Sequence, residues 1–413
     1  MHYQRMPPSN IVTILMLIAQ IGALLGFACY AVFLTILQQE WQLLHVESGL
    51  IASAFFLGYM LFVPFATVLT DRIDARQIFI LGGFLAIIGL LGMGFIAQGF
   101  FSASLFMAIQ GAGLAGTYMP GLKILSDRIH SGEVTRHISF YTAFFGLGTG
   151  LSYLISGLLL DAFGWRNVFI LIALGPFVSV CIVFFSIQPI KKHSSHSPWA
   201  ISWTDLFPVN KWREVLKNKN STQFIFGYTV HNLELFASRS WLVAFFTFCA
   251  ASSGSVFFLS ATALAALVNI SGVISSILGN EMALKIGRKK WITFAMITSA
   301  TLGLCLGASS EFGWWLIVPL AIAHAVFITA DSATLTAGLV ISTQEHIKGA
   351  AMGLHSLLGF GGGLLGPAIF GLVLDASGNP TTSISWILAY GSIVIWSVIF
   401  IAYQYRQGWH LKK

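Results

Sequence analysis

The chain has 413 residues, of which only 9% are charged and 56% are hydrophobic, and its mean hydropathy is +0.81. An average soluble chain carries about 25% charged residues, so this composition excludes an ordinary soluble protein and indicates an integral membrane protein. The net charge of +7 is then interpreted as a signal of topology. No nucleic-acid partner is expected, because no basic patch with interleaved aromatic residues lies outside the loops.

Apolar runs long enough to cross a bilayer recur along the whole chain, since a spanning helix needs about 20 apolar residues. The first run has no small-residue cleavage site and is expected to be retained as a span. The sequence predicts twelve spans, at residues 11–37, 46–70, 77–98, 101–124, 137–160, 167–188, 222–249, 256–283, 290–309, 313–340, 349–374 and 384–404.

One long polar segment, 189–221, divides these spans into two groups of six. The predicted organisation is therefore a six-helix bundle over 1–188, a cytoplasmic interdomain loop over 189–221 and a second six-helix bundle over 222–413.

The positive charges predict the orientation. If the N-terminus is cytoplasmic, the loops on the opposite side contain only Arg166, while Arg239 lies inside a span and Lys123 at the inner end of one. All other lysines and arginines fall on the side of the N-terminus, which is the pattern of cytoplasmic loops. We expect a multi-pass protein of the cell membrane with both termini cytoplasmic, in the inner membrane if the cell is Gram-negative.

Two segments half a chain apart are near-copies: residues 157–164 read GLLLDAFG and residues 371–378 read GLVLDASG. A repeat across the midpoint indicates two duplicated halves. In a hydrophobic protein, duplicated halves are typical of a transporter that rocks around a central site. The copied Asp161 and Asp375 fall at the outer ends of spans five and eleven, and we interpret both as structural.

Each half also carries a basic loop at the matching place, after spans two and eight. The pattern resembles the G-x-L-x-D-R-x-G-R-K loop of the major facilitator superfamily (MFS). The matching residues are Asp71, Arg72 and Arg76 in the first copy, and Lys285, Gly287, Arg288 and Lys289 in the second. The first copy departs from the pattern with Thr67 and Asp74 where glycine is usual, and the second has Leu284 in place of the aspartate.

Further segments resemble the same family across the chain, namely G-W-R-x-x-F at 164–169 and the glycine-rich Gly-Pro helix at 359–367. One departure is Met107, which stands where the family often carries an arginine linked to proton coupling. The segments 231–241 and 118–121 resemble the cyanate-transporter-like branch.

The resemblance implies an all-α membrane protein with twelve transmembrane helices in two pseudo-symmetric six-helix bundles. It also implies that spans one, four, seven and ten line a central cavity. The basic loops are then expected to act in conformational gating, through Asp71, Arg72, Arg76, Lys285 and Arg288.

Ionisable residues inside spans are costly and are functional candidates by default. Span seven contains His231, Glu234, Ser238 and Arg239, which lie on one helix face at about 100° per residue. Arg239 stays charged and needs an anion, which is either a permanent internal partner or a substrate. We expect Arg239, His231 and Ser238 to bind substrate, and Asp331 is the favoured internal partner of Arg239.

Span ten carries His324 and Asp331, which share a face because they are seven residues apart. Together with Glu234 they are the candidates for proton coupling, with structural pairing as the alternative for each. Neutral candidates for contact with the substrate are Tyr30, Gln110, Thr117 and Tyr118.

No catalytic motif is persuasive, so no enzyme activity and no cofactor are expected. There is no Walker loop that would indicate direct use of ATP. The four cysteines fall in apolar runs without metal-ligand spacing. A metal held by residues 231, 234, 324 and 331 is a minor alternative.

The leading hypothesis is a secondary active transporter that acts as a monomer by alternating access. Its expected substrate is a small anionic organic or inorganic solute, which includes an anionic metal chelate or siderophore. Protons are the expected coupling ion. Efflux of drugs, metabolites or siderophores is the second reading, and a transporter-like sensor is a minor one.

Overall fold

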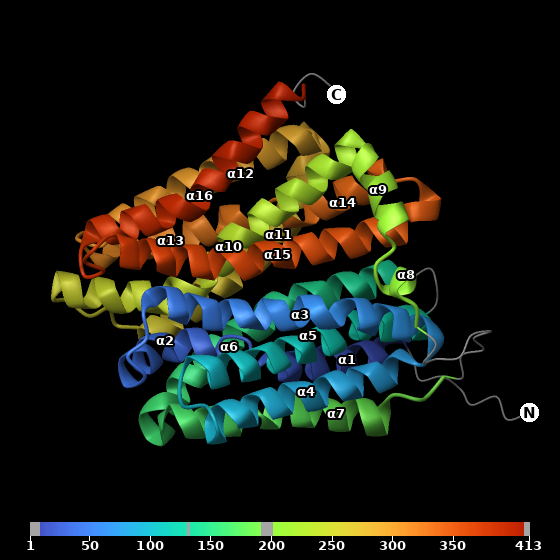
Figure 1. The fold of residues 1–413 in the computed structure, drawn as a ribbon, viewed down its shortest axis with the longest axis horizontal. Coiled ribbons are helices and arrows are strands. Elements are labelled where there is room, and N and C mark those ends of the chain that lie inside the picture. The colour runs from blue at the N-terminus through green and yellow to red at the C-terminus, as the bar shows by residue number, and fades with distance from the viewer. Residues whose placement is uncertain (1–8, 130–132, 191–200, 409–413) are drawn as a thin grey trace, which may run out of the picture. The chain divides into compact units, whose positions relative to one another are not determined.

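The computed structural model describes residues 9–129, 133–190 and 201–408. Every regular element in these ranges is a helix and none is a strand, as Figure 1 shows. The apolar runs explain this, because a helix satisfies all its backbone polar groups within one segment, as a lipid environment requires. The all-α fold class predicted from the sequence is confirmed.

The contacts of the chain divide it into two compact units. Unit 1 comprises residues 1–29 and 57–207, and unit 2 comprises residues 30–56 and 208–413. Residues 30–56, which include the end of the first predicted span and the start of the second, therefore pack with the second half of the chain.

The helices of unit 1 follow the first predicted spans. They are α1 (Ser9–Leu24), α4 (Ala75–Phe95), α5 (Phe100–Arg128), α6 (Val134–Ile172), α7 (Leu174–Ser186) and the short α8 (Trp203–Leu206). Helix α3 (His45–Arg72) begins in unit 2 and ends in unit 1.

Unit 2 contains the remaining helices. They are α2 (Cys29–Glu40, of which Cys29 belongs to unit 1), α9 (Val209–Lys217), α10 (Lys219–Ser253), α11 (Ala261–Ile286), α12 (Arg288–Ala308), α13 (Trp314–Thr329), α14 (Ser332–Ser342), the 3₁₀ turn η1 (Glu345–Ile347), α15 (Lys348–Ala376) and α16 (Ser383–Arg406).

Eleven helical segments of the described chain are long and apolar enough to cross a membrane. One of them, 136–186, has 51 residues. At 1.5 Å per residue it would reach about 75 Å, far beyond a hydrocarbon core of about 30 Å. It bends at Gly164, whose φ of 71° is not helical, so two of the predicted spans meet there. The copied Gly378 also has positive φ, 80°, just after α15 ends.

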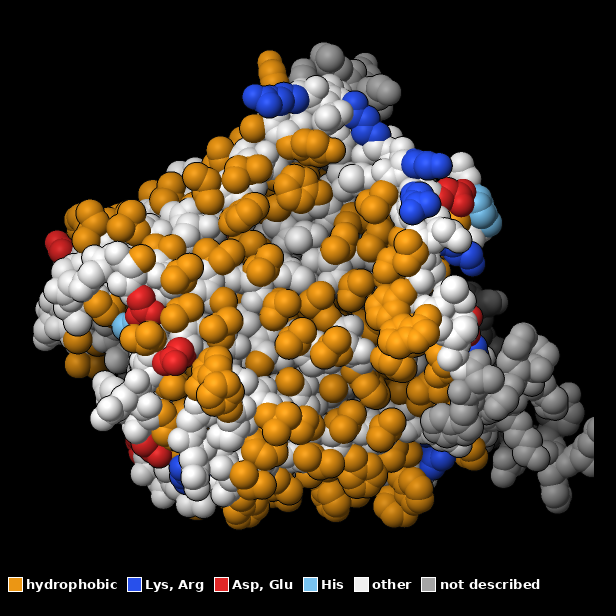
Figure 2. Space-filling view, in the orientation of Figure 1, with side chains coloured by type: hydrophobic (Ala, Val, Ile, Leu, Met, Phe, Trp, Pro, Cys, Tyr) orange, Lys and Arg blue, Asp and Glu red, His pale blue; other side chains and the backbone are white. Residues whose placement is uncertain are grey.

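Large apolar side chains are exposed on the flanks of the helices, and Figure 2 shows them covering much of the visible face. Phe101 is 86% exposed and Phe185 80%. Such surfaces are rare on soluble proteins and are expected where lipid is the solvent. Lysine and arginine side chains appear near the helix ends in the same view.

Glycines bring particular helix pairs into backbone contact. Helices α10 and α15 run side by side (Figure 1), and a Cβ added at Gly362 or Gly366 would lie 2.2 Å from Thr229 O or 2.3 Å from Leu233 O. Small residues allow this approach in membrane helices. The glycine-rich segment seen in the sequence thus fixes the backbone of α10, which carries the polar residues described next.

Candidate functional site

Helix α10 carries the polar residues at the centre of unit 2. It starts at the N-cap Asn218, whose side chain accepts bonds from the N–H groups of Asn220 and Ser221, and it ends at the left-handed Gly254. Between these caps, Glu234 is only 1% exposed and His231 only 3%. Groups buried this deeply need partners, since an unpaired buried charge is strongly unfavourable.

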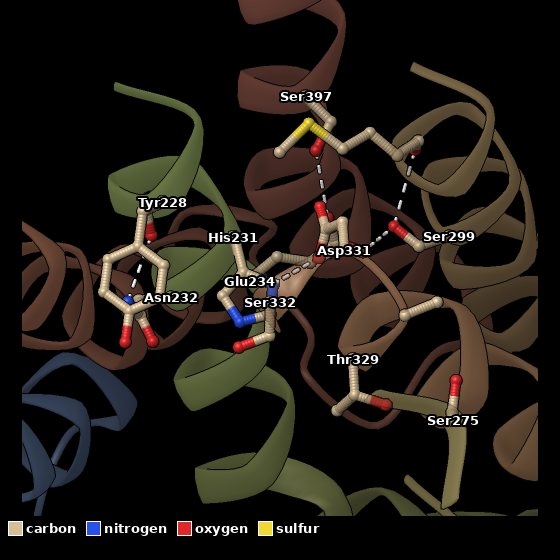
Figure 3. Close-up of polar contacts among 12 residues, drawn as sticks. Tyr228, His231, Asn232, Glu234, Ser275, Ser299, Thr329, Asp331, Ser332 and Ser397 are labelled. Atoms are coloured by element: carbon tan, nitrogen blue, oxygen red, sulfur yellow. Dashed lines mark hydrogen bonds and ion pairs between the residues drawn. The ribbon is translucent and has the colours of Figure 1, made fainter. Parts of the chain in front are cut away.

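Glu234 is held by three side chains from three other helices, drawn in part in Figure 3. Ser299 Oγ on α12 donates to Oε1 at 2.9 Å, and Ser397 Oγ on α16 donates to Oε2 at 3.0 Å. His324 Nε2 on α13 lies 3.1 Å from Oε1. Both carboxylate oxygens are therefore engaged, as buried polar groups generally must be.

Asp331 meets the second buried histidine. Its Oδ1 lies 2.8 Å from His231 Nδ1, with both side chains no more than 3% exposed. The two atoms are close without the alignment of a hydrogen bond. The partner of Asp331 among the ionisable side chains of α10 is thus His231, whereas the sequence favoured Arg239.

Asp331 sits where span ten is interrupted, between α13 and α14. The carbonyl of Ala330 accepts a bond from Trp291 Nε1 at 2.9 Å, which takes it out of the helical ladder. A Cβ at Gly279 would lie only 2.0 Å from the same oxygen. The break is therefore packed tightly by α11 and α12, and discontinuous helices of this kind often mark binding sites in transporters.

A stack of aromatic rings extends the site from His231. The ring of Tyr228 lies 5.7 Å from that of His231 and 3.9 Å from that of His355 on α15. His355 Nε2 contacts Thr336 Oγ1 at 3.2 Å. These contacts of His355 could not be predicted from the sequence, because neither residue 228 nor residue 336 follows from helical spacing on α15.

A cavity opens between α10, α11 and α13, within unit 2. It is small and partly open to the outside, and most of its lining is apolar. Its polar lining residues are Ser238, Arg239, Asn269, His324 and Thr329. A mostly apolar cavity with a few convergent polar groups is the usual form of a small-molecule site.

Arg239 gives this cavity its positive charge. The side chain is half-buried, and its guanidinium carbon lies 6.0 Å from the ring centre of Phe236. The hydroxyl of Thr329 already donates to the Ala325 carbonyl at 2.7 Å. The guanidinium is the cationic donor among the lining residues, and its planar shape suits carboxylate or phosphate groups.

Three of the four neutral residues predicted to bind substrate donate hydrogen bonds to helix backbones. Gln110 Nε2 donates to the Gly26 carbonyl at 2.7 Å, and Thr117 donates to the Gly113 carbonyl of its own helix at 3.1 Å. Tyr30 donates to the Ser48 carbonyl at 3.0 Å. Tyr118 packs its ring against Tyr141, 6.0 Å between centres. The first three are buried, and none of the four is among the residues that line the cavity of unit 2.

The first basic loop is anchored within unit 1. Arg72 donates to Asp205 Oδ2 of α8 at 2.7 Å. Arg76 donates to the Val183 carbonyl at 3.1 Å and to that of Phe184. Asp71 is exposed. This loop therefore binds the end of α7 and helix α8 of the interdomain segment.

The departure at Asp74 has a clear structural role that sequence reasoning missed. Its side chain caps α4 through the Arg76 N–H and accepts two bonds from Arg128, both at 2.8 Å. It also accepts the Ile190 N–H at 2.8 Å. Asp74 and Arg128 are only 5% and 4% exposed, so this is a buried ion pair that ties three segments together.

The second basic loop differs from the first. Lys285 is exposed at the end of α11, and Arg288, in the first turn of α12, is half-buried. Gly287 between them has φ 95°, a conformation that favours glycine. Among the described residues, this copy has no counterpart of the Asp74–Arg128 pair.

Within the described ranges, no group of three or more histidine, cysteine, aspartate or glutamate side chains is arranged to hold a metal ion. The two carboxylates of unit 2 are each engaged by a histidine rather than gathered around a common point. The metal alternative that grouped residues 231, 234, 324 and 331 gains no support from this geometry.

Several residues of the site escaped the sequence analysis, among them Ser299, Ser397 and Asn269. Each is a small polar residue in an apolar helix, and such residues occur widely as helix-packing groups. Only the approach of α12 and α16 to Glu234 distinguishes Ser299 and Ser397 from ordinary helix-packing serines.

Comparison with protein families gives a match over most of the chain. The family model described as "Major Facilitator Superfamily" matches residues 16–265.

Curated relatives are distant but cover most of the chain. Monocarboxylate transporter 6 of Homo sapiens is 24% identical over 87% of this chain and 73% of its own length. The voltage-gated purine nucleotide uniporter SLC17A9 of Rattus norvegicus is 25% identical over 81% of this chain and 76% of its own length.

Among solved structures, the nucleoside transporter NupG superposes with a TM-score of 0.75, covering 94% of this chain and 99% of that one. The sequence identity is 16%, so the likeness concerns the fold.

Proposed function

Because the chain belongs to the Major Facilitator Superfamily, whose members are transporters rather than enzymes, we propose that it is a secondary active transporter of a small anionic solute. One observation carries the proposal: Arg239, a permanent cation, lines the cavity of unit 2. A cation at the wall of a cavity supplies the charge that an anionic solute requires.

The relatives support an anionic solute. One is named for monocarboxylates and another for purine nucleotides, and both classes carry negative charge. In this proposal Arg239 binds the anionic group and Ser238 adds a hydroxyl at the cavity wall. His231 orders the site through Asp331, while Tyr30, Gln110, Thr117 and Tyr118 act by supporting helices. An anionic metal chelate or siderophore belongs to the same substrate class.

Proton coupling forms the second part of the proposal. Glu234 pairs with His324 and Asp331 pairs with His231, and protonation of either partner would change the charge of the pair. A proton taken up with an anion keeps the loaded cavity close to neutral, which lowers the cost of moving it through the membrane. The proposed mode is symport.

The proposed topology follows the charge pattern. Both termini lie in the cytoplasm, the membrane is the inner membrane if the cell is Gram-negative, and the protein acts as a monomer. The boundaries 1–188, 189–221 and 222–413 are the proposed halves and their loop. The basic loops, with Asp71, Arg72, Arg76, Lys285 and Arg288, gate the cytoplasmic side.

Transport in proteoliposomes tests the role of Arg239. Wild-type protein is assayed for uptake of lactate and of a purine nucleotide, with a neutral nucleoside as comparison. Loss of a charged hydrogen bond is worth about 1.5–3 kcal/mol, so Arg239→Gln should raise the KM for a transported anion about 10- to 100-fold. Arg239→Lys should retain part of the affinity.

The matched control is Arg166→Gln, which removes a cation that donates to the Ala97 carbonyl outside the cavity. Its KM should match that of wild type. The proposal fails if Arg239→Gln transports anions as well as wild type does, or if only neutral solutes are carried.

Efflux is the alternative direction for the same site. Everted membrane vesicles separate the two, because an exporter accumulates the solute in everted vesicles and an importer does so in right-side-out ones. Coupling is read from the same preparations, since a proton symporter should respond to an imposed pH gradient and Glu234→Gln should lose that response.

A further inference from the structure

The start of α3 is fixed by a residue from the other end of the chain. The N–H of His45 donates to Asp375 Oδ1 at 3.0 Å, and the N–H of Val46 donates to Oδ2 at 2.8 Å. His45 Nδ1 lies 2.8 Å from the same Oδ1. The carboxylate of α15 thus serves as the N-terminal cap of α3, where a negative charge is favoured.

The two helices also meet through their backbones at this end. A Cβ at Gly49 would lie 2.3 Å from the Pro367 carbonyl, and one at Gly371 would lie 2.2 Å from the His45 carbonyl. Trp241 of α10 donates to the same Pro367 oxygen at 3.0 Å, and its ring lies 6.0 Å from that of His45. At this contact α3, α10 and α15 therefore pack closely together, and the carboxylate of Asp375 lies at the edge of the packed region.

The charged edge differs from a permanent buried pair. The side chains of His45 and Asp375 are 24% and 23% exposed, whereas those of Arg128 and Asp74 are 4% and 5% exposed. A partly exposed carboxylate regains its hydration when the contact opens. The free-energy cost of separating this pair is therefore far lower than for a buried pair. The geometry suits repeated opening and closing.

We propose that the Asp375–His45 contact is a releasable latch that holds the start of α3 against α15 during one phase of the transport cycle. Residues 45–56 belong to the first six predicted spans, but they pack with the second half of the chain. Transport by alternating access requires contacts between the two halves to open and close on each side in turn. The charge pattern places this one on the outer side, where it closes access from outside.

The repeat in the sequence supplies a matched control. Asp161 occupies the same place in GLLLDAFG as Asp375 does in GLVLDASG, yet its side chain is exposed. The two aspartates are alike in local sequence and differ in their contact with α3. A substitution at Asp161 therefore shows how the loss of the aspartate from this motif affects the protein when the contact with α3 is intact.

Ser48 offers a reporter that needs no knowledge of the substrate. It lies one turn into α3, is fully buried, and donates to the Leu44 carbonyl at 3.1 Å. In a background with Cys29, Cys181, Cys249 and Cys305 replaced, Ser48→Cys is labelled with a membrane-impermeant maleimide on intact cells. Labelling then reports how often the start of α3 leaves α15 on the outer side.

Asp375→Asn should label about 10- to 100-fold faster than the parent, as expected when a charge-assisted contact is lost. Asp161→Asn should label at the parent's rate. Gly49→Ala, whose methyl group would strike Pro367, should also accelerate labelling and provides a second way to open the latch. Melting temperatures of the purified variants within a few degrees of the parent show that the fold is intact.

Equal labelling of the Asp375 and Asp161 variants would overturn the latch, as would parent labelling already as fast as that of Asp375→Asn. Neither result depends on which solute is carried. The latch and the anion site at Arg239 can therefore fail separately.

Discussion

The two units place their buried ionisable groups at different depths. In unit 1, the buried pair Asp74–Arg128 lies at helix ends, where it caps α4 and ties α5 to the segment after α7. In unit 2, the pairs His231–Asp331 and His324–Glu234 lie inside predicted spans. A charge at a helix end can be explained by capping, but a charge inside a span needs another reason, since its burial is costly there. This difference is the reason why we interpret the first pair as structural and propose a role in transport for the other two.

The largest expected effect tests the structural side of this comparison. Arg128→Ala leaves the carboxylate of Asp74 buried and unpaired, which should cost about 3–5 kcal/mol of stability. Thermal unfolding of the purified protein measures the loss. Adding Asp74→Asn should restore part of it, because the amide still accepts the capping N–H. An unchanged melting temperature for Arg128→Ala would break the comparison.

The second prediction tests the functional side. Glu234→Gln keeps the shape of the side chain, and the hydroxyls of Ser299 and Ser397 can rotate to suit the amide, so the fold should survive. Transport at a fixed pH gradient should fall about 10-fold or more, as a charged hydrogen bond is lost. The unit 1 counterpart is Gln110→Met, which removes one neutral bond and should cost about 1 kcal/mol of stability with transport retained. Equal transport losses in both variants would remove the distinction between the units.

The smallest expected effect concerns the exposed pair Arg72–Asp205 of unit 1. The Ser202 N–H, the Ser202 hydroxyl and Arg72 hold the pKa of Asp205 below its ordinary value of 3.8. Because the folded-state pKa is lowered, the contribution to stability is present above that ordinary value and is lost as the pH falls through it and then through the lowered pKa. The exposure of this pair keeps the effect small.

Fluorine NMR can follow this loss at α8. The resonance of 5-fluorotryptophan at position 203, assigned with Trp203→Phe, should shift as the pH falls below about 4. Asp205→Asn should give the low-pH position already at neutral pH. A resonance that ignores both changes would show that the ion pair does not order α8.

Much of this organisation follows from the sequence, and the reasons are physical. Apolar runs and the scarcity of charge predict the helices, and the span that bends at Gly164 was separated correctly because Arg166 interrupts the apolar pattern. The candidates Glu234, Asp331 and His324 were found because ionisable residues in apolar runs stand out.

The pairing of these residues could not be predicted, because it depends on how helices far apart in sequence are rotated toward each other. Helical spacing placed Arg239 on the same face as Glu234, yet Glu234 meets α12, α13 and α16, whereas Arg239 borders the cavity. Asp74 was noticed only as a departure from a motif, since its partner Arg128 lies a whole helix away.

The cap of α3 by Asp375 also bears on how the protein is made. The two residues that meet, His45 and Asp375, are 330 positions apart. At a synthesis rate of about 5–20 residues per second, roughly 15–65 s pass between their appearance. During that interval the first turn of α3 has no cap from α15, so its backbone N–H groups must be satisfied by water or by the insertion machinery. A nascent chain that ends before Asp375 lacks this cap, and the start of α3 acquires it only after α15 has been synthesised.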